Sequence, residues 1–213
     1  MVKVKICGIT NVADALKAVE LGADALGFVL AESPRKITLD KLKEISFSIP
    51  PLVSRVGVLV NEDISLAKSL LEEGVLDYVQ LHGDEDLKYC QRLPLRKVIK
   101  AVRLQNRDDI ENLKSFKEVG AILIDSFVEG QRGGTGKVAD WSLALEAKKI
   151  GLPLILSGGL NIDNVREAIS RVRPYAVDVS SGVEKSPGRK DYQLMEIFIR
   201  RAKMESRGLH ELA

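Results

Sequence analysis

Residues 2–30, VKVKICGITNVADALKAVELGADALGFVL, have the pattern of a strand, a helix and a second strand. Val2–Cys7 alternates apolar and polar side chains with the period of a strand. Asn11 then precedes ADALKAVELGA, whose apolar residues recur with helical period, and Gly22 follows where a helix end favours glycine. Ala25–Leu30 is again apolar and typical of a strand. The stretch therefore predicts two parallel strands joined by a crossover helix.

The same alternation continues to the end of the chain. Further strands are predicted at Arg55–Val60, Tyr78–His82, Val98–Arg103, Ala121–Asp125, Leu154–Ser157 and Ala176–Ser180. Between them, helix caps are expected at Asn61 and Asn161, and a helix end at Gly74. About eight strand–helix units in a chain of 213 residues predict an α/β protein with a single (β/α)8 barrel, the TIM barrel fold. A doubly wound sheet is the alternative, but it usually has fewer strands at this length.

Composition predicts one domain over residues 1–213, because no linker rich in Pro, Gly or Ser interrupts the pattern. The tail after Lys203, residues 204–213, is expected either to extend the last helix or to fray. A net charge of +2 with interspersed signs offers no surface for nucleic acid or an anionic membrane. Two cysteines are too few for a disulfide framework, and the chain starts directly in a strand, so we expect a cytoplasmic protein without a signal peptide.

Strand alternation assigns side chains to the two faces of each strand. One face of each strand is rich in Val and Ile and is expected to pack against the helices. The opposite faces carry Lys5 with Cys7, Gln80 with His82, Leu123 with Asp125, and Asp178 with Ser180. We expect these mixed faces to line the barrel, with polar groups at the carboxyl ends of the strands, where barrel active sites form. Gln80, His82 and Asp178 are accordingly expected to bind substrate.

Cys7 is the first candidate for chemistry. A free cysteine is more often a small buried hydrophobic residue than a base. Here, however, the thiol ends a strand two residues from Lys5 on the same face, and a nearby ammonium group favours the thiolate that a cysteine base needs. Cys90, in the helical stretch EDLKYCQRL, has no such partner and is expected to be structural.

Asp125 ends the apolar run AILID, so its carboxylate must be solvated, paired or functional. A structural ion pair is the simple alternative. If the carboxyl group is partly desolvated, its pKa would rise and it could act as a general acid near neutral pH. Asp178, inside VDV, permits the same argument but could equally belong to a buried polar network.

Two glycine-containing segments, SGGLN at 157–161 and SSGVE at 180–184, follow the last two predicted strands. In barrels this is a frequent phosphate site, because glycines let backbone N–H groups approach the phosphate. Gly158, Gly159, Ser181 and Gly182 are therefore expected to bind phosphate. The segment EGQRGGTGK at 129–137 departs from a nucleotide P-loop and fits a mobile lid better.

Arg35, in SPRK after the second strand, is of a type that is usually solvated, but at a barrel mouth it could fork onto a carboxylate. The chain has only two histidines, His82 and His210. A histidine-rich metal site is therefore not expected.

A series of short motifs runs through the chain: KICGIT at 5–10, SPR at 33–35, VGVLVN at 56–61, VQLHG at 79–83, ILIDS at 122–126, GGTG and DW at 133–141, LSGGLN at 156–161, and VDVSSGVE from 177 followed by PG..D. In this order they resemble the phosphoribosylanthranilate isomerase family of tryptophan biosynthesis, from Lys3 to about Lys203. KICGIT and VDVSSGVE are specific to that family.

The resemblance implies an Amadori rearrangement of N-(5-phosphoribosyl)anthranilate to 1-(2-carboxyphenylamino)-1-deoxy-D-ribulose 5-phosphate, without metal or organic cofactor. It implies that Cys7 is the general base and Asp125 the general acid. It also implies that Arg35 meets the anthranilate carboxylate, and that the SGGL and SSGVE loops hold the phosphate.

Two rival interpretations stay open. Another phosphosugar barrel enzyme is one, although a ribulose-phosphate epimerase needs metal-binding histidines on its strands. An indoleglycerol-phosphate synthase relies on catalytic lysines and glutamates, for which Lys5 and Lys100 are candidates. The other rival is a barrel that binds a phosphate ligand without catalysis, although binding alone requires neither Cys7 nor Asp125. The expected partner is a small phosphosugar, and the oligomeric state is open between a monomer and a homodimer.

Overall fold

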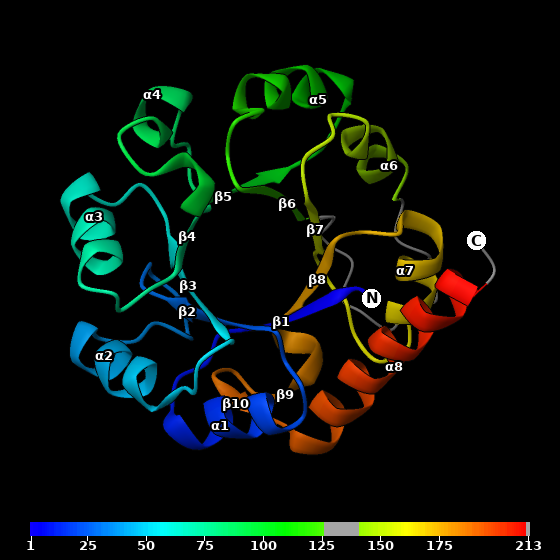
Figure 1. Ribbon diagram of the computed structural model, residues 1–213, viewed down its shortest axis with the longest axis horizontal. Helices are drawn as coiled ribbons and strands as arrows, with labels where there is room; N and C mark the ends of the chain where they lie inside the picture. Colours follow the sequence, from blue (N-terminus) through cyan, green and yellow to red (C-terminus); the bar gives the residue numbers. More distant parts are fainter. Residues whose placement is uncertain (126–140, 212–213) are drawn as a thin grey trace.

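The computed structural model describes residues 1–125 and 141–211. Its strands form a closed barrel in chain order, and the helices surround it (Figure 1). The barrel strands are β1 (Lys3–Cys7), β2 (Ala25–Val29), β3 (Ser54–Leu59), β4 (Tyr78–Leu81), β5 (Val98–Arg103), β6 (Ala121–Asp125), β7 (Leu154–Ser157) and β8 (Ala176–Val179). The predicted (β/α)8 barrel is confirmed.

The outer layer consists of α1 (Val12–Glu20), α2 (Leu39–Ser48), α3 (Ile64–Glu72), α4 (Leu87–Cys90), α5 (Arg107–Leu113), α6 (Ser142–Lys148), α7 (Val165–Val172) and α8 (Tyr192–Glu211). Short 3-10 turns are η1 (Leu95–Lys97), η2 (Lys114–Phe116) and η3 (Ser181–Val183). Helix α8 continues to Glu211, so the tail after Lys203 extends the last helix through that residue. Among the described helices, none is long and apolar enough to cross a membrane.

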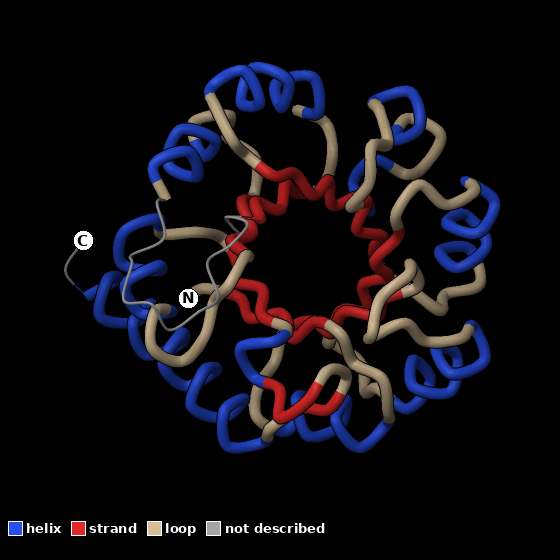
Figure 2. Tube along the Cα trace, turned by 180° about the vertical axis from the view of Figure 1, so that it is seen from behind, coloured by secondary structure: helices blue, strands red, loops and turns tan. Residues whose placement is uncertain are grey.

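Parallel pairing joins each strand to the next, and β1 pairs with β8 to close the ring, with Lys5 opposite Asp178. Figure 2 shows this ring from the opposite side, with the helices outside it. Apolar side chains fill two regions. The larger core lies between the strands and the helices and includes Val4 and Ile6. The smaller core lies inside the barrel and includes Leu123 and Ile155.

Local capping explains where the helices begin. The side chain of Asn11 accepts a hydrogen bond from the backbone N–H of Asp14, as predicted for the start of α1. Gly22 and Gly74 follow α1 and α3 with φ angles of +95° and +67°, conformations that favour glycine at a helix end.

Two predicted caps are wrong by a few residues. Asp63, and not Asn61, caps α3 by accepting from Ser65 N–H. Asn61 instead accepts a hydrogen bond from the backbone N–H of Asp84, in the loop after the neighbouring strand. Similarly, α7 begins after Asn164, while the side chain of Asn161 bonds the backbone N–H groups of residues 163 and 164 and forms the turn before the helix.

A feature that the sequence did not predict is the antiparallel hairpin of β9 (Glu184–Ser186) and β10 (Arg189–Lys190), which follows β8. Gly188, with φ of +76°, lies in its turn. The hairpin brings Lys190 back to the carboxyl ends of β1 and β8, where it contributes to the site described next.

Candidate active site

The predicted interior faces come together at the carboxyl-terminal end of the barrel. Lys5, Gln80 and Asp178 are all buried inside it. Nζ of Lys5 donates hydrogen bonds to Oε1 of Gln80 at 2.8 Å and to Oδ1 of Asp178 at 2.9 Å. Oδ2 of Asp178 accepts from the Ser157 hydroxyl at 3.0 Å. Both carboxylate oxygens of Asp178 thus belong to a buried polar network, the second of the two roles considered for this residue.

Gln80 extends this network toward the end of β6. Its amide Nε2 lies 2.9 Å from Nδ1 of His82. The other nitrogen of the imidazole ring, His82 Nε2, lies 3.7 Å from Oδ2 of Asp125. Nε of Arg103 lies 3.9 Å from the same oxygen. Asp125 is mostly shielded, with 16% of its side chain exposed. A line of polar groups therefore crosses the barrel from Lys5 on β1 to Asp125 on β6.

Cys7 is buried at the end of β1. Burial raises the pKa of the Cys7 thiol above its ordinary value and outweighs the ammonium groups of Lys5 and Lys190, which act in the opposite direction. Asp178 adds to the rise. The influence of Lys5 on the thiol pKa therefore has the predicted sign, but burial outweighs it, and the sequence does not reveal how completely the sulfur is desolvated.

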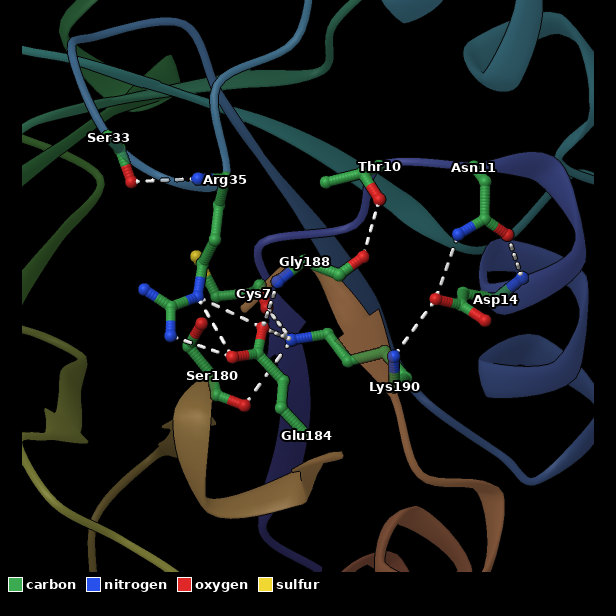
Figure 3. A network of polar contacts seen from close by, with 10 residues as sticks. All are labelled: Cys7, Thr10, Asn11, Asp14, Ser33, Arg35, Ser180, Glu184, Gly188 and Lys190. Atoms are coloured by element: carbon green, nitrogen blue, oxygen red, sulfur yellow. Dashed lines mark hydrogen bonds and ion pairs between the residues drawn. The ribbon is translucent and has the colours of Figure 1, made fainter. Parts of the chain in front are cut away.

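A second ionic group lies beside Cys7 (Figure 3). The Lys190 ammonium is fully buried and donates to Glu184 Oε1 at 2.8 Å and to the backbone carbonyls of Cys7 at 2.6 Å and Ser180 at 3.3 Å. It thereby ties the ends of β1 and β8 together. Burial by itself raises the pKa of the Glu184 carboxyl group. The combined effect of Arg35 and Lys190 is opposite and larger, so the pKa lies below its usual value.

Arg35 lies opposite this carboxylate. Its Nε and Nη2 donate to Glu184 at 2.7–3.1 Å in a fork–fork arrangement. A guanidinium group has five N–H donors, so the edge formed by Nη1 and the second Nη2 hydrogen can still take a further carboxylate. Figure 3 shows the Arg35 guanidinium held by Glu184 next to Cys7 and Ser180.

The two predicted phosphate loops lie side by side. A β-carbon on Gly182 would collide with the carbonyl oxygen of Leu160, so the loop after β8 packs directly on the loop after β7. Gly158 and Gly159 have φ angles of +87° and +69°, and nothing lies within 4 Å of the place where a Gly159 side chain would start. Ser181 is exposed at the start of η3.

Three residues of this region were missed as site candidates: Glu184, Lys190 and Gly27, whose missing side chain leaves space for the Cys7 sulfur. Glu184 stands inside the quoted SSGVE segment, so a signal was present. Lys190 gave none, since a lysine in a polar stretch is normally solvated. Ser180, inside the same segment as Glu184, has a buried hydroxyl oxygen without a hydrogen-bond partner among the described residues.

Other candidates lie outside the site. Cys90 ends α4 in the core around the barrel, and burial raises its pKa to about 11. Lys100 pairs with buried Glu85 at 3.0 Å, and its neighbours Ile99 and Ala101 occupy the barrel interior, so it faces away from the interior. The predicted lid at 129–137 lies outside the described residues. Within residues 1–125 and 141–211, no cluster of three or more His, Cys, Asp or Glu side chains could hold a metal ion.

Comparison with known proteins shows what this architecture resembles. Residues 4–201 match the family model described as N-(5'phosphoribosyl)anthranilate (PRA) isomerase. N-(5'-phosphoribosyl)anthranilate isomerase of Thermotoga neapolitana is 49% identical over 205 residues, which cover 95% of this chain and 99% of the relative.

Two solved structures are also similar to this chain in fold and sequence. One is a phosphoribosyl anthranilate isomerase in complex with reduced 1-(o-carboxyphenylamino)-1-deoxyribulose 5-phosphate, with a TM-score of 0.85, 47% identity and coverage of 96% of this chain and 100% of that one. The other shows monomers of a dimeric phosphoribosylanthranilate isomerase from Thermotoga maritima, with a TM-score of 0.84, 45% identity and coverage of 95% and 99%.

Proposed function

The chain belongs to the N-(5'-phosphoribosyl)anthranilate isomerase family, and on this premise we propose that Cys7 and Asp125 carry out the proton transfers of its reaction. The protein is an isomerase of tryptophan biosynthesis. The proposed reaction is the Amadori rearrangement of N-(5-phosphoribosyl)anthranilate to 1-(2-carboxyphenylamino)-1-deoxy-D-ribulose 5-phosphate.

The chemistry requires one acid and one base. Protonation of the ring oxygen of the furanosylamine opens the sugar to a Schiff base, and Asp125 in its protonated form supplies that proton. A base then removes the proton from the adjacent sugar carbon, which gives an enolamine that tautomerises to the ketone. Cys7 in its thiolate form is the proposed base. The two residues end β1 and β6, so the sugar would bind between them.

The remaining groups are proposed to bind the substrate. The unused edge of the Arg35 guanidinium would fork onto the anthranilate carboxylate. Gly158, Gly159, Ser181 and Gly182 would hold the phosphate through backbone N–H groups of the two packed loops. Gln80 and His82 would lie beside the sugar, and Asp178 would support the site through Lys5 and Ser157.

The observation that carries this proposal is the line of polar contacts that joins the two reacting ends of the barrel. Lys5 and the Cys7 thiol influence each other's pKa, and the contacts through Gln80 and His82 lead from Lys5 to Asp125. A barrel that only binds a phosphate ligand needs no such pairing of a thiol and a carboxyl group. The synthase alternative is weakened because Lys100 faces away from the interior.

The test is direct. Purified protein is incubated with freshly prepared phosphoribosylanthranilate, and the loss of anthranilate fluorescence is followed with time. Turnover that depends on Cys7 and Asp125 supports the proposal, whereas binding without turnover would favour the non-catalytic barrel.

We further propose that the protein is cytoplasmic, since both of its cysteines are free, and that it acts as a homodimer, since the Thermotoga maritima relative is described as dimeric. Leu52 supports a second copy as the partner: it is fully exposed, has a φ of +74°, and borders a cavity lined also by Tyr78 and Tyr175. Tyr78 and Tyr175 are exposed as well, and a group of exposed apolar side chains at one place is typical of an interface. Light scattering should give a dimer, and a monomer from Leu52→Asp.

A further inference from the structure

The Lys5–Gln80–His82 contacts have only one consistent arrangement of hydrogens. A lysine ammonium group has three donors and no acceptor. Burial by itself lowers the pKa of Lys5, but Asp178 and Cys7 raise it above its usual value, so the group stays protonated. The Gln80 atom that lies 2.8 Å from Nζ must therefore be the carbonyl oxygen Oε1.

The orientation of the Gln80 amide then determines the state of His82. With Oε1 held by Lys5, the NH2 group faces His82 and donates to Nδ1 at 2.9 Å. Nδ1 must consequently be the bare, accepting nitrogen, because a hydrogen on Nδ1 would point at a second donor. The neutral ring carries its hydrogen on Nε2 instead. That nitrogen is the one 3.7 Å from Oδ2 of Asp125.

We propose that Lys5, acting through Gln80, fixes His82 in the Nε2–H tautomer, and that His82 in this form is a positioning residue for Asp125. The Nε2–H group faces Oδ2, so the hydrogen that Asp125 transfers resides on Oδ1. At 3.7 Å the two atoms are too far apart for a hydrogen bond, so the proposal requires that they approach when substrate binds, as catalytic groups in free enzymes often do. The second half of the proposal rests on the proposed role of Asp125 as the general acid.

The first experiment reads the tautomer without reference to activity. The protein is labelled with ¹⁵N-histidine, and long-range ¹H–¹⁵N correlation at about pH 8 distinguishes a protonated from a bare ring nitrogen. Only two histidines contribute, so His210→Gln assigns the His82 signals. Wild-type His82 should show a protonated Nε2 and a bare Nδ1. A hydrogen on Nδ1 would overturn the proposal.

Gln80→Glu tests the role of Gln80 with almost no change in shape. A carboxylate can still accept from Lys5 but cannot donate to Nδ1, so the His82 hydrogen should move from Nε2 to Nδ1. In the same variant kcat should fall by about tenfold or more, a larger factor than any rise in KM. Gln91→Glu, at an exposed position, is the matched control and should change neither readout. An unchanged tautomer in Gln80→Glu would overturn the control by Gln80.

A second pair of variants applies if Gln80→Glu does not fold. His82 is one quarter exposed, so substitutions there are tolerable for the fold. In His82→Gln the amide NH2 falls near the place of Nε2 and can donate to Asp125, whereas in His82→Asn it falls near Nδ1 and cannot. His82→Gln should therefore retain several times the kcat of His82→Asn. Equal loss in the two variants would overturn the positioning role.

The outcomes separate this inference from the proposed function. If Asp125→Asn is inactive and the tautomer switch leaves kcat unchanged, the positioning role is refuted while the isomerase mechanism stands. If Asp125→Asn is fully active, the proposed acid is refuted, and the NMR measurement still decides whether Lys5 and Gln80 fix the tautomer.

Discussion

Gly27 lies directly against the sulfur of Cys7: a β-carbon on Gly27 would stand 2.6 Å from Sγ. The two residues are register partners on β1 and β2. The φ angle of Gly27 is not in the left-handed region, so the backbone itself does not require glycine. The missing side chain is what leaves space for the thiol, and this makes the position specific to the site.

Gly27→Ala should therefore displace the thiol and lower kcat strongly, with a smaller effect on KM, because overpacking a buried site forces side chains out of place. The control is Gly57→Ala on β3, whose added β-carbon would press on Leu76 and not on the site. Both variants should lose stability in urea unfolding, but only the first should lose turnover. Equal turnover in Gly27→Ala and Gly57→Ala would contradict the role of Gly27 in leaving space for the Cys7 thiol.

Cys7→Ala and Asp125→Asn should each reduce kcat by ~10²-fold or more, as expected for lost proton-transfer groups. Substrate affinity should change far less. Cys90→Ala and the exposed Asp108→Asn are matched controls that leave the reacting groups in place. Initial rates from anthranilate fluorescence measure the effect, and near-normal turnover in either site variant would remove that residue from the mechanism.

Arg35→Ala should mainly raise KM. The expected loss of binding free energy is ~1.5–3 kcal/mol, the range for a hydrogen bond to a charged group. Arg35→Lys should restore little, because an ammonium group cannot fork onto Glu184 and a carboxylate at once. Glu184→Gln should raise KM as well, since the guanidinium loses the carboxylate that holds it. An unchanged KM in Arg35→Ala would reassign the carboxylate contact.

The Cys7 thiol should titrate above its ordinary value near 8.5, since burial raises its pKa. The productive enzyme needs the thiolate and a protonated carboxyl group together, so a raised thiol pKa makes that form a minority species. The pH profile is still bell-shaped, with its basic limb at the Cys7 pKa. Thiolate absorbance of a Cys90→Ala background should show this titration, and one completed below about pH 8 would contradict the structure.

Lys100→Met should destabilise the fold by ~3–5 kcal/mol, because it leaves Glu85 buried without its cation. Turnover of the folded variant should fall far less than in Cys7→Ala, since Lys100 faces away from the interior. Urea unfolding and initial rates measure the two effects. A loss of turnover as large as that of Cys7→Ala would revive the synthase alternative with a catalytic lysine.

The sequence by itself determined the barrel and the residues on its interior face. Strand alternation has a period of two, so Lys5 and Cys7 had to share one side of β1, and Leu123 and Asp125 one side of β6. Parallel strands joined by crossovers bring all their carboxyl ends to one rim. Both arguments are local, and for that reason the strand bounds agree with the structure to within one residue at either end.

The tertiary structure alone decided which side chains meet across the barrel. Arg35 and Glu184 are 149 residues apart, and Lys5 and Gln80 are 75 apart, so no local pattern joins them. The caps of α3 and α7 shifted for a related reason, because Asn61 and Asn161 had other backbone partners in the folded loops. The pKa of the Cys7 thiol is raised because burial has a larger effect than the nearby ammonium groups, which lower it. Desolvation is set by every atom packed around the sulfur, and that packing exists only in the closed barrel.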